Sequence, residues 1–148
     1  MSLNLNSDFI QKNVDDNFTL NHLVNGIKGM ATFTNDFIIN KENGQSKYIC
    51  TDSSRAVFKY KDENGIIQKD IKANKLKNNV KNPIITKSKQ LYENESSRLL
   101  NESSTENQFD VLTMNRINIG MLTDQFLKIK NIDDHVDEYA KEMILVIN

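Results

Sequence analysis

The chain has 148 residues with a formal net charge of −1, 38% hydrophobic residues, one cysteine and two histidines. This length fits one domain, or a small domain with an extension, and the cysteine and histidine counts exclude an internal disulfide and an ordinary structural zinc site. No apolar run approaches the ~20 residues of a membrane-spanning helix and no signal peptide is visible, so we expect an intracellular protein that is not secreted and has no membrane partner.

The first predicted element is a helix from about Leu20 to Phe37. Asp15, Asp16, Asn17 and Thr19 are the candidates for its N-cap, because a short oxygen side chain can accept from the free N–H groups of the first turn. Gly26 and Gly29 each weaken a helix by up to ~1 kcal/mol relative to Ala. We therefore expect either a close approach of backbones on that side or a break near Gly29. The apolar face of this helix consists of Leu20, Leu23, Val24, Ile27, Met30, Ala31 and Phe37.

An antiparallel hairpin is predicted after a loop at residues 38–46. Residues 47–51 form a short strand candidate, and residues 56–61 have the two-residue period of a strand. The alternation places Ala56, Phe58 and Tyr60 on one side and Val57, Lys59 and Lys61 on the other. Residues 62–65 end in glycine and predict the turn, after which the strand resumes at Ile66.

The short run from Thr51 to Arg55 has a local structural interpretation. Asp and Ser side chains can bond to their own backbone in a tight turn. Arg55 can close such a turn by pairing with Asp52, and we prefer this interpretation to a binding role for Arg55.

A second helix is predicted from about Asp70 to Tyr92, with Pro83 ending one helical segment and starting the next. Residues 93–107 are polar and low in complexity, so we expect a linker there. These elements predict a small α+β domain at residues 1–92 and a helical arm at residues 108–148. The predicted fold class is α+β, with an N-terminal helix, an antiparallel β-hairpin unit, a packed helix and a C-terminal helical arm.

The arm has the most regular pattern in the chain. Eleven positions follow a 3-4 heptad spacing and nine of them are apolar: Leu112, Asn115, Ile119, Leu122, Phe126, Ile129, Asp133, Val136, Ala140, Met143 and Ile147. Such a seam packs either on the chain's own core or on a second copy. In the second case Leu112, Ile119, Leu122, Phe126, Ile129 and Val136 would form the contact. A turn at residues 131–134, with Asp134 as N-cap, could divide the arm into two helices.

Motifs of catalysis are absent from the sequence. His22 and His135 lie in different predicted elements and lack the neighbours of a general base or a metal ligand. Cys50 lies on an apolar strand and is interpreted as an inert thiol. No Walker loop, G-x-G-x-x-G or G-x-S-x-G occurs. We predict a protein that is not an enzyme and uses no metal or other cofactor.

Charge is unevenly distributed along the chain. Residues 47–89 hold 11 Lys and Arg residues against 4 acidic ones, whereas residues 90–148 hold 5 basic residues against 11 acidic ones. The basic segment can bind nucleic-acid phosphates, or it can pair with the acidic segment within the chain or between copies. Tyr48, Phe58 and Tyr60 could stack on bases or form the apolar face of the sheet. The candidate phosphate ligands are Arg55, Lys59, Lys61, Lys69, Lys72 and Lys75.

One set of motifs lies within the first two thirds of the chain: Leu20-x-His22-Leu23-x-x-Gly26-x-x-Gly29-x-Ala31-x-Phe33, Tyr48-Ile-Cys-Thr-Asp-Ser-Ser-Arg55, Phe58-Lys-Tyr-Lys-Asp-Glu-Asn-Gly65, Lys69-Asp70 and Lys75-Leu76. This set resembles a domain found in uncharacterised proteins of giant nucleocytoplasmic DNA viruses. The similarity covers roughly residues 18–92. It implies a viral source and a domain, but no activity.

Two functions are therefore expected. The first is a non-enzymatic viral protein, a virion or assembly component that acts through protein contacts or self-association. The second is a protein that binds nucleic acid without sequence specificity through residues 47–89. The resemblance places either one in the cytoplasm of an infected host cell or in the virion.

Overall fold

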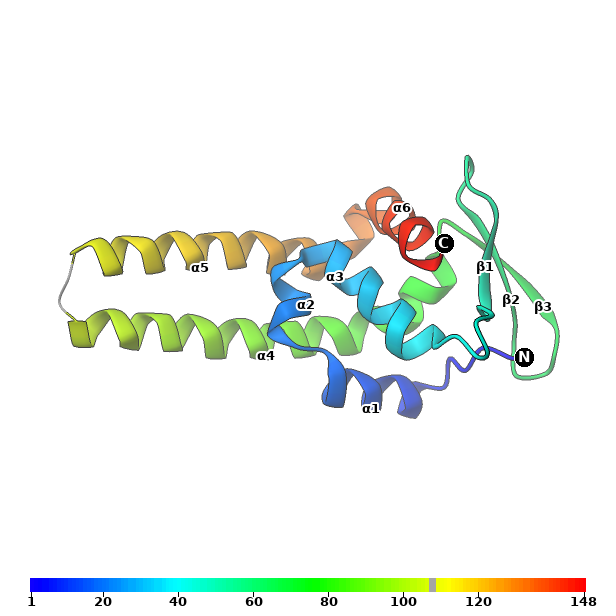
Figure 1. Cartoon of the computed structure of the whole chain (residues 1–148), viewed down its shortest axis with the longest axis horizontal. Coiled ribbons are helices and arrows are strands. Elements are labelled where there is room, and N and C mark those ends of the chain that lie inside the picture. The colour runs from blue at the N-terminus through cyan, green and yellow to red at the C-terminus, as the bar shows by residue number, and fades with distance from the viewer. Residues whose placement is uncertain (107–108) are drawn as a thin grey trace.

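The computed structural model describes residues 1–106 and 109–148, with side chains described outside residues 103–112. It has the predicted α+β class, with helices and one three-stranded antiparallel sheet. Two long helices form a hairpin that projects from one end, while the sheet lies at the opposite end (Figure 1). No helix among the described residues is long and apolar enough to cross a bilayer.

The elements follow one another along the chain with short connections. In order they are α1 (Ser7–Asn17), α2 (Leu20–Val24), α3 (Gly26–Phe33), the π-helical turn η1 (Thr34–Ile39), β1 (Tyr48–Asp52), β2 (Val57–Lys61), β3 (Ile67–Ile71), α4 (Asn74–Glu106), α5 (Phe109–Lys130), the 3-10 turn η2 (Ile132–Asp134) and α6 (Val136–Ile147).

The predicted N-terminal helix is divided into α2, α3 and η1. The division falls at Gly26, whose φ of +60° is a conformation that favours glycine. Gly29 permits a close approach, because a Cβ there would lie 1.9 Å from the carbonyl oxygen of His22. The expected break and the expected close approach thus both occur, at different glycines. Thr19 is the N-cap, in a capping box with His22.

α1 was not predicted, although its residues carry a helical pattern. Ile10 and Val14 are four residues apart and both are buried against the rest of the core. The Asn6 side chain caps the helix by accepting from the N–H groups of Asp8 and Phe9. The signal that could have revealed α1 is this asparagine, followed by apolar residues at helical spacing.

The sheet has the order β1-β2-β3, and its two faces differ in chemistry. Tyr48, Phe58 and Tyr60 lie on the inner face, where their rings stack with centroids 4.9 Å and 6.0 Å from that of Tyr48. Lys59 and Lys61 lie on the outer face and are exposed. The alternation read from residues 56–61 is therefore confirmed, because successive side chains of a strand point to opposite faces.

A buried carboxylate joins the sheet to the long helix α4. Asp70 of β3 has no exposed surface. It accepts from the N–H groups of Lys75 at 2.8 Å and Leu76 at 3.0 Å, and from the hydroxyl of Tyr48 at 3.0 Å. Asp70 thus caps the first turn of α4 and connects it to β1, so the Lys69-Asp70 and Lys75-Leu76 motifs have a structural role. Burial first, and then the charge of Asp70, raises the pKa of Tyr48, which keeps its hydroxyl protonated as the donor.

Helix α4 differs from the prediction in three ways. It begins at Asn74 rather than near Asp70, because Asp70 and Ile71 pair with β2 as part of β3. Pro83 lies inside it and does not divide it. The buried Val80 and Ile84 on either side of Pro83 hold the helix on the core, and this packing outweighs the lost backbone hydrogen bond. The expected linker at residues 93–107 is helical as far as Glu106, while residue 107 lies outside the described residues. The polar composition suggested a linker, but one side of this stretch packs on α5, and that packing stabilises the helix.

The arm is divided into α5 and α6 by a turn, as one of the two alternatives predicted. His135, not Asp134, is the N-cap residue of α6. The heptad seam packs within the chain. Asn115 donates to the Leu99 carbonyl oxygen at 3.1 Å, and Phe126 stacks on Tyr92 with ring centroids 4.9 Å apart.

This packing corrects the predicted interaction residues. Leu122, Phe126 and Ile129 are buried in the chain's own core, so they are not available to a second copy. Ile119 and Val136 are half-buried. The side chain of Leu112 lies outside the described residues.

Asp70→Ala is expected to lower the free energy of unfolding by about 2–4 kcal/mol. It removes a helix cap and leaves the buried Tyr48 hydroxyl without its acceptor. Urea unfolding followed by circular dichroism measures the change. Glu63→Ala, in the exposed turn between β2 and β3, is the matched control and should stay within about 0.5 kcal/mol of the parent protein. Equal effects of the two substitutions would contradict the role given to Asp70.

Candidate functional site

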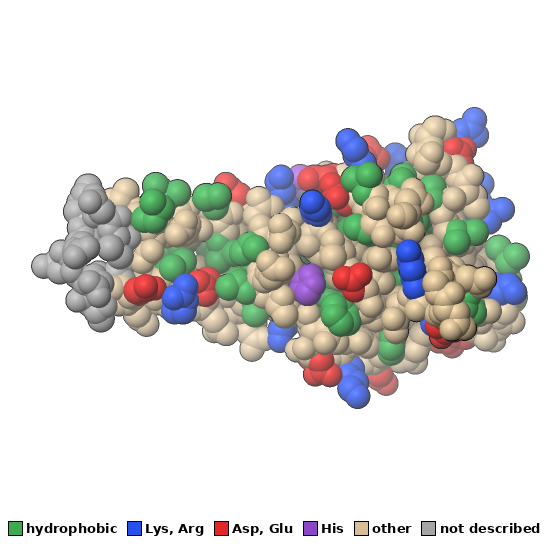
Figure 2. Space-filling model, viewed as in Figure 1, with side chains coloured by type: hydrophobic (Ala, Val, Ile, Leu, Met, Phe, Trp, Pro, Cys, Tyr) green, Lys and Arg blue, Asp and Glu red, His purple; other side chains and the backbone are tan. Residues whose placement is uncertain are grey.

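The outer face of the sheet is the most distinctive surface of the described chain. No helix covers it, and it presents Lys59, Lys61 and Lys69 together with three exposed isoleucines: Ile49 (51% exposed), Ile67 (64%) and Ile71 (52%). Several Lys and Arg side chains project at the end of the molecule that holds the sheet (Figure 2). We refer to Ile49, Val57, Lys59, Lys61, Ile67, Lys69 and Ile71, with Arg55 at the edge, as the outer sheet face.

Two lysines of this face lie directly opposite each other. Lys59 of β2 pairs in register with Lys69 of β3. Side chains directly opposite on neighbouring antiparallel strands have Cβ atoms about 5 Å apart, and like charges there are destabilising. No ion pair with Lys59, Lys61 or Lys69 is present among the described residues. The fold therefore tolerates a local repulsion that nothing within the described chain relieves.

Arg55 stands at the end of the face, in the turn between β1 and β2. Asp52 accepts there from the Ser54 hydroxyl at 2.7 Å and the Arg55 N–H at 3.2 Å. These bonds, the Ser54 hydroxyl first, lower the pKa of Asp52. The guanidinium of Arg55 lies 3.8 Å from Asp52, yet its side chain is 83% exposed. The predicted turn is confirmed, and it leaves most of the Arg55 side chain facing solvent.

A shallow groove crosses this end of the face. Its volume is about 420 Å³, and its lining residues are Thr51, Asp52, Arg55, Val57, Lys59, Lys69 and Ile71. Asp52 is the one acidic residue of the lining, and it already accepts bonds within the turn. The groove thus offers three cations and two aliphatic side chains, a composition that suits an anionic ligand with an apolar part.

The two remaining candidate phosphate ligands, Lys72 and Lys75, lie elsewhere and contact other groups of the chain, as do two further lysines of the basic segment. Lys72 pairs with Asp137 at 3.0 Å. Lys75 donates to the Gln68 side chain at 3.2 Å. Lys77 and Lys81 both reach Asp133 at 2.9 Å. The basic segment is therefore divided. Lys72, Lys77 and Lys81 pair with acidic residues of the C-terminal part, whereas Lys59, Lys61 and Lys69 have no such pair among the described residues.

Asp133 neutralises two of these lysines, Lys77 and Lys81. The ammonium groups of Lys81 and Lys77 lower the pKa of this carboxyl. Lys77 is nearly buried, with 6% of its side chain exposed, so it depends on a nearby counter-charge. Asp133, just before α6, thus holds the basic side of α4.

The aromatic residues do not take part in the outer sheet face. Tyr48 and Phe58 have no exposed surface, and Tyr60 has 9%. Base stacking by these three rings, considered from the sequence, is therefore wrong, because they belong to the inner face of the sheet.

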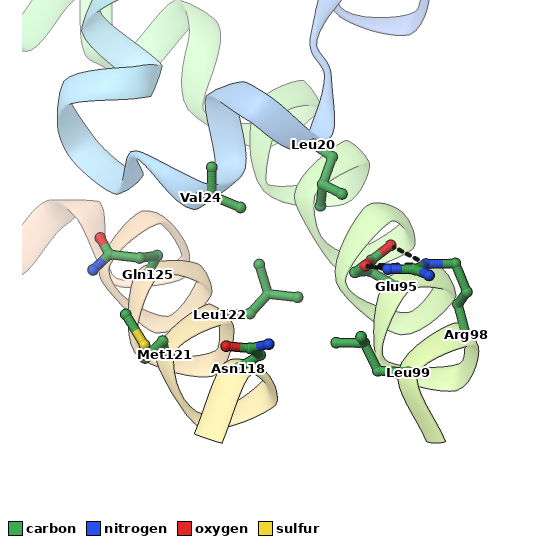
Figure 3. Close-up of a pocket in the computed structure, with 9 residues that line it drawn as sticks. All are labelled: Leu20, Val24, Glu95, Arg98, Leu99, Asn118, Met121, Leu122 and Gln125. Carbon is green, nitrogen blue, oxygen red and sulfur yellow. Dashed lines mark hydrogen bonds and ion pairs between the residues drawn. The ribbon is translucent and has the colours of Figure 1, made fainter. Parts of the chain in front are cut away.

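A second groove lies where α2 crosses the α4–α5 hairpin. Figure 3 shows Leu20, Val24, Leu99 and Leu122 pointing into it, with the Glu95–Arg98 ion pair on one wall. Its volume is about 350 Å³, near the lower end of the range of ligand sites. Gln125 and Asn118 add neutral polar groups. The one carboxylate of the lining, Glu95, is paired with Arg98, so the groove offers mainly apolar and neutral polar contacts.

His22 and Cys50 both contribute to the packing of the fold. His22 takes part in the α2 capping box and stacks on Phe18, and burial lowers its pKa although Asp36 opposes this shift. Cys50 lies half-buried on the inner face of β1. Within residues 1–106 and 109–148, no group of His, Cys, Asp and Glu side chains is placed to hold a metal ion.

Comparison of the chain with models of known protein families, with curated proteins and with solved structures finds no match.

Asp133→Asn is expected to lower the urea midpoint at pH 7, because it leaves Lys77 and Lys81 without their counter-charge. The pKa of Asp133 is lower in the folded state, so its contribution is present above the ordinary carboxyl pKa of 3.8. The contribution is lost as the pH falls through the lower folded value. Urea unfolding at a series of pH values should show the two proteins converging in acid. Asp134→Asn, the exposed neighbour, is the control, and an equal loss there would contradict the assignment.

Proposed function

We propose that the protein is a non-enzymatic nucleic-acid-binding protein that contacts phosphates through the outer sheet face, without reading sequence. The observation that carries the proposal is the Lys59–Lys69 pair, which lies on an uncovered face and has no acidic partner among the residues that the structure describes. A phosphate between the two ammonium groups would relieve their repulsion, and release of counterions from the nucleic acid would drive binding.

Charge neutralisation elsewhere supports the choice of this face. Lys72, Lys77 and Lys81 are paired with Asp133 and Asp137. If the acidic C-terminal part had covered the strands as well, ion pairs within the chain would account for every lysine of the basic segment. Cations that the fold leaves exposed and unpaired are the ones available to an anionic partner.

The chemistry of the face favours contacts to the backbone of the nucleic acid. Lysine is a flexible point charge without the bidentate geometry of arginine, and Arg55 is the only arginine in the basic segment. The rings that could stack on bases are buried. The exposed isoleucines can pack against sugar edges but offer no hydrogen bonds to bases. Binding should therefore depend on charge and salt rather than on sequence.

A virion or assembly component that acts through protein contacts stays the second candidate. The seam expected to make those contacts is used inside the chain, but α5 leaves Ile117 and Met121 exposed on its outer side. The viral source stays a prediction from the resemblance, as do the host-cell cytoplasm and the virion as locations.

Lys59→Ala with Lys69→Ala is expected to weaken binding to a duplex of random sequence roughly 30-fold at moderate salt, because each lysine neutralises one phosphate. The four cations of the outer sheet face are Arg55, Lys59, Lys61 and Lys69. If each contacts one phosphate, the slope of log K against log salt is about −3.6, and the double variant should show about −1.8. Fluorescence anisotropy over a salt series gives both values. The control is Lys12→Ala with Lys89→Ala, which removes the same charge from exposed positions on α1 and α4.

Equal losses in the two double variants would contradict the site and leave only non-specific attraction by net charge. Absence of binding at low salt would contradict the function. Vesicles with anionic headgroups are tested in parallel, because exposed isoleucine beside lysine can also suit a bilayer surface. Binding to vesicles without binding to DNA would overturn the proposal.

Lys59→Thr is expected to raise the free energy of unfolding by about 0.2–1 kcal/mol. The substitution removes one of two opposed like charges and introduces a residue that favours strands. Urea unfolding at low ionic strength measures the gain, and high salt should reduce it. Lys61→Thr, which faces Ile67 across the strands, is the matched control and should give a smaller gain. A loss of stability in Lys59→Thr would show that the lysine has a structural role.

A further inference from the structure

Helix α5 has an exposed side opposite the one that packs on α4. The residues of this side recur at helical spacing, and all are exposed: Thr113, Ile117, Gly120, Asp124 and Leu127. We call them the outer arm face. Ile117 is 51% exposed and Leu127 is 43% exposed. In the view of Figure 2, hydrophobic side chains lie open along the arm. Nothing in the described chain covers this face.

Gly120 lies at the centre of the outer arm face, and no contact within the described chain requires a glycine there. A Cβ at this position would meet no atom within 4 Å. A glycine in the interior of a helix costs about 1 kcal/mol relative to alanine, and this site has room for alanine. A small residue at the middle of an exposed helix face allows the backbone of another helix to approach closely.

The charges around Gly120 are arranged symmetrically. Arg116 lies four residues before it and Asp124 four residues after it, and both are exposed. The two residues are eight positions apart, about 12 Å along the axis, so they are too far apart to pair with each other. Neither side chain has an ion-pair partner within the described residues.

We propose that the outer arm face binds the same face of a second copy of this chain, with the two α5 helices antiparallel and crossing at Gly120. In this arrangement Arg116 of each copy meets Asp124 of the other, so one two-fold axis satisfies four charges. Leu127 of each copy then lies opposite Thr113 of the other. A parallel pairing would instead place Arg116 against Arg116.

The dimer should be weak and reversible. The face from Thr113 to Leu127 is about 21 Å long, which is less than the extent of a standard interface of about 1,600 Å². We therefore expect a dissociation constant in the micromolar range or above. Because the sheet lies at the end opposite the hairpin tip, the antiparallel dimer carries its two sheets at opposite ends (Figure 1).

Sedimentation equilibrium of the full chain, without nucleic acid, tests the proposal over about 1–300 µM. Arg116→Asp and Asp124→Arg should each raise the dissociation constant at least about 10-fold, because each places like charges together. The double variant Arg116→Asp with Asp124→Arg restores opposite charges and should return within about 3-fold of the parent protein. Lys89→Asp, on α4, is the control for a change of net charge.

Circular dichroism checks that each variant stays folded, and the mass of the parent protein is itself a test. A parent protein that stays monomeric across the range overturns the proposal. A dimer that both single variants leave unchanged overturns this face as the interface, and a double variant that stays monomeric overturns the antiparallel register. Lys59→Ala with Lys69→Ala should not change the dissociation constant, which separates this result from the test of nucleic-acid binding.

Discussion

The carboxylate of Asp70 is the interaction on which the arrangement of the structure depends. A carboxylate without exposed surface is stable only when hydrogen bonds replace its water. Here three donors replace it: the Tyr48 hydroxyl on β1 and the backbone N–H groups of Lys75 and Leu76 at the start of α4. Because β1 and α4 are far apart in the sequence, the hydrogen bonds of this one carboxylate fix the direction in which the long helix leaves the sheet.

That constraint also determines which face of the sheet is free. With Asp70 pointing to the interior, the alternation of β3 sends Lys69 to the outside, and the register with β2 sends Lys59 to the same side. The aromatic rings of Tyr48, Phe58 and Tyr60 share the interior with Asp70. The position of the basic face is therefore linked to the burial of a single acidic residue, and its lysines take no space in the core.

The helical hairpin illustrates a similar division between interior and exterior. Its heptad seam is used between α4 and α5, where Phe126 stacks on Tyr92 and Asn115 bonds to the Leu99 carbonyl. Any partner must then use the sides of the helices that the seam leaves free. Gly120 and the charges on either side of it lie there, separate from the sheet, so the two proposed contacts can be altered independently.

Local patterns in the sequence by themselves determined the α+β class, the inward Phe58 beside the outward Lys59 and the turn at Asp52–Arg55. Each depends on residues a few positions apart, within the period of a strand or a single turn. The sequence offered four candidate caps for α2, and the structure selects Thr19. Only the tertiary structure decided that α4 continues through Pro83, because packing of Val80 and Ile84 outweighs one lost hydrogen bond. It likewise decided which lysines are neutralised, since Lys77 and Asp133 lie in different elements and meet only after the hairpin has formed.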